Sequence, residues 1–287
     1  MDISIVIPAY NEEESILRVI GSVKEVMDKT KFSYEIIVVD DGSKDRTAER
    51  VSQNKNAELI KHPYNKGYGA SLKTGAIYAK SNYILYIDAD GQHDANDIPR
   101  LLRYIGRFDM IVGARRSKTM HLSHKKYGKK ILWLIAYFLT GKKVPDLNSG
   151  FRLIKREIVM KFMHILPNAF SFTTTITLCC IKNAYNVVYI PIRIIPRKTG
   201  KSSIKSLRDG FKFTLIIIRI IMLFSPLRIF MPISLFVLIP GMLHLFYVGI
   251  IFRNITDKAI LCVISGILLF CFGLLSDQLA QIRRMPK

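Results

Sequence analysis

Two acidic residues one position apart follow an apolar run near residue 85. Asp88 and Asp90 close this run, and Gln92 comes two positions later. Because alternate side chains of an extended strand share one face, all three are predicted to point to the same side at the strand's carboxyl end. Hard oxygen ligands of this kind suit Mg²⁺ or Mn²⁺, so the group is a candidate site for a metal-bound diphosphate. The alternative is an Asx-rich turn that closes the strand and binds nothing.

The elements that must position these side chains alternate along the first part of the chain. Apolar, strand-like runs are followed by helix-like runs, a pattern that predicts a parallel α/β sheet, whose ligands bind at the carboxyl ends of the strands. The expected strands are 3–7, 34–39, 58–61, 83–87 and 110–112, and the expected helices start at residue 12 and cover 45–52, 66–80 and 95–107.

Polar groups also follow the first two expected strands. Pro8, Tyr10 and Glu12 come after the first, and Asp40 and Asp41 come after the second. Strand ends of a parallel sheet meet at one edge, so these groups are expected beside the acidic pair. Three convergent strand ends predict a single nucleotide pocket.

The net charge of +21 is unevenly distributed. Residues 1–114 carry 15 Lys and Arg against 17 Asp and Glu, whereas residues 115–287 carry 28 against 5. The basic part is interleaved with long apolar runs, so the predicted partner is an anionic membrane surface and not nucleic acid. An apolar fraction of 49% supports a buried core and excludes a disordered chain.

The four cysteines form neither a disulfide framework nor a zinc-binding pattern, since Cys179 and Cys180 are adjacent and the other two lie in apolar runs. The first residues form a short apolar run without a basic leader, which predicts a first strand and not a signal peptide. The N-terminal part is therefore expected in the cytosol.

Two uncharged apolar runs, 231–252 and 259–276, are each long enough to cross the hydrocarbon core of a membrane. The short connection between them predicts a tight hairpin, so both ends face the same side. Basic residues flank the pair, among them Arg228, Arg283 and Arg284, and place that side in the cytoplasm. The alternative is a buried helical hairpin of a soluble domain. Self-association through the two spans is also expected.

Two further apolar segments, 131–139 and 211–224, carry or adjoin basic residues. They are interpreted as helices that lie in the membrane interface. The alternative for each is an amphipathic helix of a protein core, because hydrophobic periodicity does not separate the two cases.

The motifs, taken in order together with the segment from Asp146 to Arg152, resemble glycosyltransferase family 2 over about residues 1–205. That resemblance implies a GT-A fold, a form of α/β fold, and nucleotide-sugar donors. The run from Arg197 to Ser202, the interfacial segments and the C-terminal hairpin are similar to the polyprenyl-phosphate glycosyltransferases, which include the dolichyl-phosphate mannose synthases. Three parts follow: a GT-A domain over 1–205 with an interfacial helix at about 121–139, a juxtamembrane helix over 206–228, and a transmembrane hairpin with a basic cytoplasmic tail over 229–287.

The resemblance also implies roles for individual residues. Asp90 and Gln92 bind the metal directly, and Asp88 lies at both the nucleotide and the metal. Asp146 is a catalytic candidate that orients the sugar or the acceptor, or alternatively a turn-capping aspartate. The residues implied around the nucleotide are Pro8, Tyr10, Glu12, Asp40, Asp41, Lys66 and Gly67, the last two alternatively forming a helix-entry turn without a ligand.

A basic stretch follows the fifth expected strand and contains no acidic residue from position 116 to position 130. The resemblance makes such cations ligands of the phosphates of acceptor or donor, whereas the alternative is a solvated or lipid-facing surface. The implied phosphate ligands are Arg115, Lys126, Arg152, Arg197, Lys201 and Ser202, with Arg197 also a catalytic candidate. Asp88, Asp90 and Gln92 together are called the metal motif. His93 lies next to this motif and is the one histidine suspected of touching the site, although a surface histidine is the favoured interpretation.

The implied reaction is an inverting transfer of one sugar to a lipid phosphate, which is already anionic at neutral pH and needs little help from a general base. GDP-mannose, UDP-glucose and UDP-N-acetylglucosamine all stay open as donors, and dolichyl and undecaprenyl phosphates as acceptors. One alternative is a membrane-bound family 2 enzyme that acts on a sugar hydroxyl and needs a positioned base. The other is a membrane-anchored scaffold with a vestigial nucleotide fold.

Overall fold

The computed structural model describes residues 2–115, 137, 144–169, 171–195, 218, 221–252 and 256–284. The chain divides into two compact units, 1–205 and 206–287, and each unit is described by itself. The segments predicted as interfacial helices lie largely outside the described residues.

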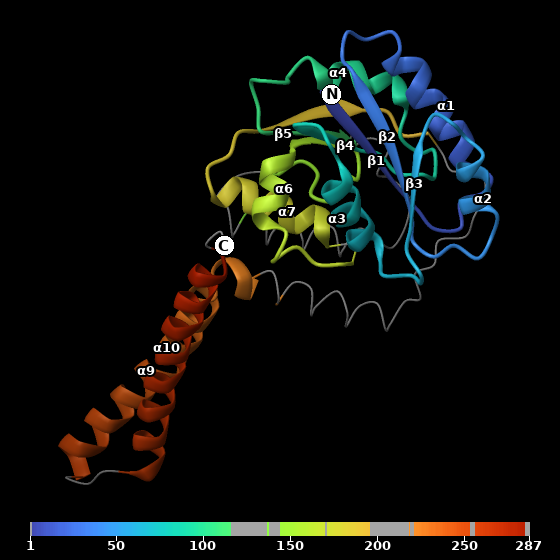
Figure 1. The fold of residues 1–287 in the computed structure, drawn as a ribbon. Helices are drawn as coiled ribbons and strands as arrows, with labels where there is room; N and C mark the ends of the chain where they lie inside the picture. Colours follow the sequence, from blue (N-terminus) through green and yellow to red (C-terminus); the bar gives the residue numbers. More distant parts are fainter. Residues whose placement is uncertain are drawn as a thin grey trace. The chain divides into compact units, whose positions relative to one another are not determined.

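A seven-stranded sheet forms the centre of the first unit, in the order β3-β2-β1-β4-β6-β5-β7 (Figure 1). The polar groups predicted to form a pocket follow β1, β2 and β4, which are neighbours in this order, so their carboxyl ends meet at one edge. The strands are β1 (Ile3–Ala9), β2 (Tyr34–Asp40), β3 (Glu58–Lys61), β4 (Tyr83–Tyr86), β5 (Met110–Arg115), β6 (Arg152–Lys155) and β7 (Val187–Ile192).

The predicted α/β sheet is present, with β1, β2, β3 and β4 paired in parallel, and one strand that was not predicted makes it a mixed sheet. β6 runs antiparallel to both β4 and β5, with Tyr86 opposite Arg152 and Val112 also opposite Arg152. An antiparallel strand begins where its parallel neighbours end. The segment that precedes β6 is therefore delivered to the same edge of the sheet as the metal motif.

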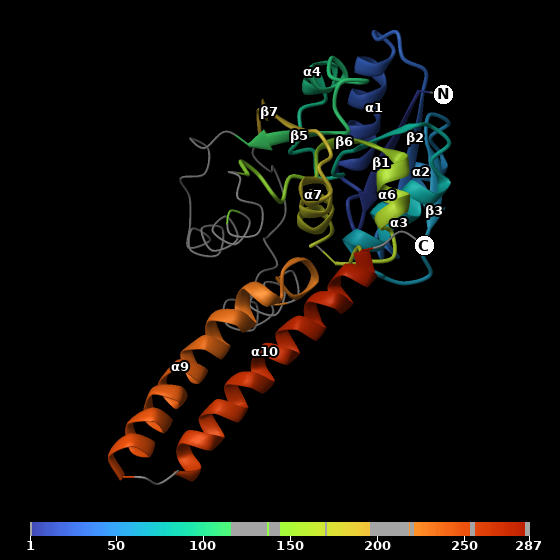
Figure 2. The ribbon, with the colours of Figure 1, turned by 90° about the vertical axis from the view of Figure 1, so that its left-hand side faces the viewer.

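Helices cover both faces of the sheet, so the strands are buried on both sides (Figures 1 and 2). Ile3, Ile5 and Ile7 of β1 belong to the core that the helices α1 and α4 cover. Val6 faces the other way and packs on Gly75 of α3, where an added Cβ would collide with the valine side chain. The first face carries α1 (Ile16–Met27), η1 (Ala95–Asp97) and α4 (Ile98–Leu102), and the second carries α3 (Tyr68–Tyr78), α6 (Arg156–Phe162) and α7 (Phe172–Lys182), while α2 (Thr47–Ser52) lies beside β3.

The second unit contains two long antiparallel helices, α9 (Leu227–Phe252) and α10 (Asp257–Arg284). By length and composition both can cross a membrane, and only 11% and 17% of their most apolar stretches are buried. The low burial disfavours the alternative of a soluble helical hairpin. The two helices approach closely at Gly241, Gly266 and Gly273, where an added Cβ would lie 2.6 to 2.8 Å from the facing helix.

Candidate active site

The loops that follow β1 and β2 are joined by hydrogen bonds. The backbone N–H of Asn11 donates to Ser43 Oγ at 2.9 Å, and the N–H of Lys44 donates to Asn11 Oδ1 at 2.8 Å. Asn11 has a φ of 54°, a left-handed conformation that asparagine tolerates better than most residues. Thr47 Oγ1 accepts from the N–H of Glu12 at 2.8 Å. These bonds fix the spacing of the two loops on which the predicted nucleotide residues lie.

Asp40, at the end of β2, is buried with one carboxylate oxygen unsatisfied. Its exposed fraction is 3%, and Oδ2 accepts from the N–H of Ser43 at 3.3 Å. Oδ1 has no hydrogen-bond partner among the described residues. A buried carboxylate oxygen without a donor is costly, so it is well suited to a ligand N–H or hydroxyl. Nearby, Pro8 is buried within β1 and Tyr10 is 41% exposed at its end.

Asp41 holds the loop that leads into α3, and its predicted contact with base and ribose stays a prediction. Oδ1 accepts from His62 Nδ1 at 2.7 Å and from the N–H of Lys66 at 2.9 Å, and Oδ2 accepts from the N–H of Gly67 at 2.8 Å. The imidazole is fixed in turn by Thr74 Oγ1, 2.9 Å from Nε2. With both oxygens occupied and 5% of its side chain exposed, Asp41 organises the entry to α3.

The glycine-containing turn before α3 packs against the chain after α6. Gly67 has a φ of 104°, and an added Cβ would lie 2.5 Å from the carbonyl oxygen of Asn168. A Cβ at Gly69 would also collide with this segment. Close backbone packing therefore accounts for the two glycines, and the predicted contact of Lys66 and Gly67 with the nucleotide stays a prediction. The Lys66 side chain lies over the ring of Tyr64, with Nζ 5.8 Å from the centroid.

Asp88 is enclosed by residues from three segments. Tyr68, the first residue of α3, donates its hydroxyl to Asp88 Oδ1 at 2.8 Å. Gly150 lies directly against Oδ2, and a Cβ added there would overlap the carboxylate and the Tyr68 hydroxyl. His93 Nδ1 is 3.6 Å from Oδ2. The position of the Asp88 carboxylate is thus set before any ligand binds.

Asp90 and Gln92 form a tight turn in which the N–H of Gln92 donates to Asp90 Oδ1 at 3.0 Å, with Gly91 at a φ of 71°. No Lys or Arg of the described part of the chain pairs with Asp88 or Asp90. Two uncompensated carboxylates fit a hard divalent cation. Since the described residues contain no group of three or more His, Cys, Asp or Glu that could hold an ion, the remaining ligands would come from a diphosphate and water.

Asp146 and Arg115 form a bidentate ion pair at the same edge. Nε and Nη2 of Arg115 donate to Oδ2 and Oδ1 of Asp146 at 2.7 and 2.8 Å, and the backbone N–H of Asn148 also donates to Oδ1, at 3.1 Å. Burial raises the pKa of Asp146, but the hydrogen bonds and charge of Arg115 outweigh it and hold the pKa below its usual range. Because its carboxylate oxygens already accept these hydrogen bonds, Asp146 is a weak general base. The side chain of Arg115 is 33% exposed.

Among the described residues Arg152 is the largest fully buried side chain. Its contacts lie within the protein, and the predicted contact with a phosphate stays a prediction. Its Nε and Nη2 donate to the carbonyl oxygen of Ser149, and Nη1 donates to Thr173 O at 3.0 Å and to Thr177 Oγ1 at 3.1 Å. No carboxylate in the described part of the chain lies at ion-pair distance from it. Burial lowers the pKa of Arg152, because it disfavours the charged guanidinium and no paired carboxylate among the described residues offsets this effect. Arg152 ties the segment before Gly150 to α7.

Replacing Arg152 with Met is expected to lower the free energy of unfolding by about 2 kcal/mol. The substitution leaves the carbonyl oxygen of Ser149 without the donors that Arg152 supplies, at about 1 to 3 kcal/mol, whereas Thr173 O still accepts from Thr177 Oγ1 at 2.8 Å. Part of the loss is offset because a buried charge disappears. Thermal unfolding in detergent measures the change. Arg156→Met is the matched control, since Arg156 donates to Ala76 O and Ile77 O nearer the surface. Equal losses for both variants would contradict a special role for Arg152.

Four predicted phosphate ligands, Lys126, Arg197, Lys201 and Ser202, lie outside the described residues. The described chain reaches residue 195 beside the metal motif, because the N–H of Ile195 donates to the carbonyl oxygen of Gln92 at 2.9 Å. Arg197 follows two positions later in the sequence.

The sequence did not reveal three residues that support the motifs, Tyr68, His62 and Gly150. It also did not reveal that Arg115 pairs with Asp146. His93 is also corrected, since 6% of its side chain is exposed and it is not a surface residue. The spacing of residues within a motif carries no information on such contacts, because apart from the contact between His93 and Asp88 they join residues at least 20 positions apart. The one available signal was Gly150, since glycine allows another group to approach the backbone closely.

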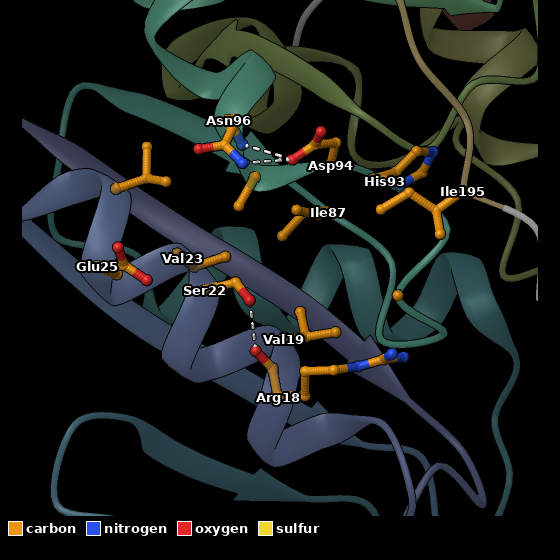
Figure 3. Close-up of a pocket in the computed structure, with 13 residues that line it drawn as sticks. Arg18, Val19, Ser22, Val23, Glu25, Ile87, His93, Asp94, Asn96 and Ile195 are labelled. Atoms are coloured by element: carbon orange, nitrogen blue, oxygen red, sulfur yellow. Dashed lines mark hydrogen bonds between the residues drawn. The ribbon is translucent and has the colours of Figure 1, made fainter. Parts of the chain in front are cut away.

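A cavity of about 210 Å³ lies on the α1 face of the sheet (Figure 3). Its lining includes Gly91 and His93 of the metal motif, with Ile195 beside His93. The side chain of Arg18 extends from α1 to Gly91, where an added Cβ would lie 2.6 Å from Nη2 of the arginine. Ligand pockets for drug-sized molecules measure about 300 to 1,000 Å³, so the cavity is small for a nucleotide sugar. None of the predicted nucleotide residues lines it.

Comparisons with known proteins agree with this geometry. The sequence model of glycosyl transferase family 2 matches residues 4–163, and that of the GtrB C-terminal hairpin matches residues 225–282. An uncharacterized protein of Methanocaldococcus jannaschii is 29% identical over 222 residues, 74% of this chain and 88% of its own length.

Two relatives have descriptions that name a lipid phosphate. A dolichyl-phosphate beta-glucosyltransferase of Trichomonas vaginalis is 31% identical over 183 residues, and an undecaprenyl-phosphate 4-deoxy-4-formamido-L-arabinose transferase of Salmonella choleraesuis is 30% identical over 187 residues. The matches cover 56% and 60% of this chain, and 56% and 57% of those proteins, so this chain spans little more than half of their length.

The fold is also that of a solved enzyme. Glucosyl-3-phosphoglycerate synthase from Mycobacterium tuberculosis, determined with Mn²⁺, UDP and glucosyl-3-phosphoglycerate, aligns with a TM-score of 0.59 over 77% of this chain and 78% of that one. The sequence identity is 19%, which supports the shared fold alone.

Proposed function

Because the chain belongs to glycosyltransferase family 2, we propose that it transfers a single sugar from a nucleotide sugar to a polyprenyl or dolichyl phosphate, with inversion at the anomeric carbon. The observation that carries the proposal is the meeting of two uncompensated carboxylates, Asp88 and Asp90, with the unsatisfied oxygen of Asp40 at one sheet edge of a chain that ends in an apolar helical hairpin.

A lipid acceptor is favoured by the second unit and by the two relatives whose descriptions name dolichyl and undecaprenyl phosphate. In this proposal α9 and α10 anchor the protein in the membrane, and the catalytic unit faces the cytoplasm. The basic residues that flank the hairpin support this orientation, because positively charged flanks favour the cytoplasmic side. Anionic lipids would then lie against the basic part of the chain. Self-association through the hairpin stays a prediction.

Mg²⁺ or Mn²⁺ fits the carboxylates, with Asp90 and Gln92 as ligands and Asp88 beside the diphosphate. Such an ion would neutralise charge that develops on the leaving nucleoside diphosphate. Asp40 would accept a hydrogen bond from the base or ribose, since its Oδ1 has no donor in the described structure. These residues bind and orient the donor, and none of them has to abstract a proton.

Arg115 and Asp146 act on the acceptor side in this proposal. The bidentate pair fixes the guanidinium, and its remaining N–H groups, which have no partner among the described residues, would contact the lipid phosphate. The phosphate arrives as an anion and is itself the nucleophile. Positioning and charge neutralisation therefore supply the catalysis.

The rate of transfer is expected to rise as pH passes about 6 and then to level off, because the second pKa of a phosphate monoester lies near 6. The lowered folded pKa of Asp146 means that the stability it contributes is present above its unfolded pKa and is lost only in acid. Asp146→Asn should lower the rate by a similar factor at every pH from about 5 to about 8. A variant that removed the inflection would identify Asp146 as a titrating base.

The test of the function is incubation of detergent-purified protein with Mn²⁺ and a panel of nucleotide sugars, with polyprenyl phosphate or a neutral lipid-linked sugar as acceptor. Mass spectrometry of the products should show a polyprenyl monophosphosugar formed with one donor. Transfer only to a sugar hydroxyl would favour the family 2 alternative, which needs a positioned base. No turnover of any donor would favour the vestigial scaffold.

A further inference from the structure

His93 lies where three segments of the first unit meet. Its ring stacks on Phe151, with the ring centroids 5.4 Å apart and the planes at 22°. Its backbone forms an isolated β-bridge with Ile194, beyond the end of β7. Phe151 follows Gly150, which lies against the Asp88 carboxylate. The histidine thus contacts the metal motif, the motif before β6 and the chain that leads toward residue 196.

The ring also makes a polar contact that packing does not require. The backbone N–H of Asp88 donates to His93 Nδ1 at 3.5 Å, and no second acceptor for this N–H occurs in the described structure. In this contact Nδ1 is the acceptor, so a neutral imidazole would carry its proton on Nε2. With 6% of its side chain exposed, the imidazole takes the place of water as the acceptor for the Asp88 N–H.

We propose that His93 is a positioning residue for the metal site, where Nδ1 holds the backbone of Asp88 so that the Asp88 and Asp90 carboxylates face the metal-bound diphosphate. The inference rests on the proposed function in that it assumes a metal-dependent donor site. It adds a supporting residue that touches neither the sugar nor the reacting atoms.

The proposed role of His93 depends on where this turn lies. Asp88 and Asp90 lie beyond the last residue of β4, where the ladder of sheet hydrogen bonds has ended. Tyr68 restrains one carboxylate oxygen of Asp88, and the N–H of Ile195 holds the carbonyl oxygen of Gln92 at 2.9 Å. The contact to His93 is the hydrogen bond that the described structure gives the backbone N–H of Asp88 itself. A supporting partner of this kind typically contributes about 10- to 100-fold in metal affinity.

His93→Asn and His93→Leu form a matched pair for the test, since the two side chains have nearly the same shape and both remove the ring that stacks on Phe151. Asn can place its carbonyl oxygen near the position of Nδ1, whereas Leu has no acceptor. Mn²⁺ binding to the full-length protein, with UDP and separately with GDP, is measured by electron paramagnetic resonance. Thermal unfolding is measured alongside.

We expect His93→Leu to weaken Mn²⁺ binding by about 10-fold or more relative to His93→Asn, at similar unfolding temperatures. Equal affinities of the two variants would overturn the proposal and leave His93 a packing residue. Absence of Mn²⁺ binding to the natural protein would overturn it as well. If the leucine variant does not fold, His93→Phe provides the comparison without an acceptor and keeps an aromatic ring.

Lipid transfer by the natural protein separates this inference from the proposed function. Transfer to polyprenyl phosphate together with equal Mn²⁺ affinities of the two variants would refute the role of His93 alone. No transfer to lipid, together with weakened Mn²⁺ binding in His93→Leu, would refute the proposed acceptor and keep the role of His93.

Discussion

Replacing Asp90 with Asn is expected to lower sugar transfer by about 10³-fold. Asn keeps the side-chain oxygen that accepts from the N–H of Gln92 at 3.0 Å, so the turn should persist, but the negative charge that attracts the cation is lost. A metal ion contributes several kcal/mol of charge stabilisation, and each 1.36 kcal/mol changes the rate about tenfold. Steady-state transfer to polyprenyl phosphate at saturating Mn²⁺ measures the effect.

Asp94→Asn is the matched control, because it removes one carboxylate charge four positions away. Asp94 caps η1 by accepting from the N–H of Asn96 at 3.0 Å, and asparagine can accept the same bond. Its activity should stay within about twofold of the natural protein. If Asp90→Asn retained more than about a tenth of the activity with an unchanged requirement for Mn²⁺, Asp90 would not be a metal ligand.

The second large effect is expected at Gly150, where Ala should lower turnover by about 100-fold with little loss of expression. An added Cβ would overlap the Asp88 carboxylate and lie 2.7 Å from the Tyr68 hydroxyl, so one of the two must move. Displacing a catalytic group by about 1 Å can reduce the rate about 100-fold. Turnover and Mn²⁺ affinity should fall together, because the displaced group belongs to the metal site.

Gly21→Ala is the control for this substitution. Gly21 lies on the exposed side of α1, with nothing within 4 Å of an added Cβ. Alanine there should leave turnover unchanged and raise stability by up to about 1 kcal/mol through helix propensity. Normal Mn²⁺ affinity in Gly150→Ala would show that Asp88 tolerates the methyl group and is not held by close packing.

Much of the fold could be predicted from local patterns. The five strands expected in the first 115 residues and the two apolar helices all occur, because alternation and long uncharged runs depend on neighbouring residues alone. The strand β6 was missed because a four-residue run, Arg152–Lys155, carries no readable period. Its antiparallel direction depends on pairing with β4 and β5, which are distant in the sequence.

The candidate site, like the fold, could be predicted from the sequence only in part. The polar residues after β1, β2 and β4 were predicted to meet, and the strand order places those strands side by side. The partners that Asp41 and Arg152 have within the protein could not be predicted, because a residue type indicates what a side chain can bind and not which partner reaches it first. His62 and the α3 turn occupy Asp41, and Ser149 with α7 occupies Arg152.

The sequence by itself determined the family, the metal motif and the membrane hairpin, since each is written in the order and spacing of nearby residues. The tertiary structure decided which of the polar side chains remain available to a ligand. Asp40 keeps an unsatisfied oxygen, whereas its neighbour Asp41 has none. That difference arises from contacts across 21 to 26 positions, which form only when the folded chain buries these groups and each buried polar atom must find a partner.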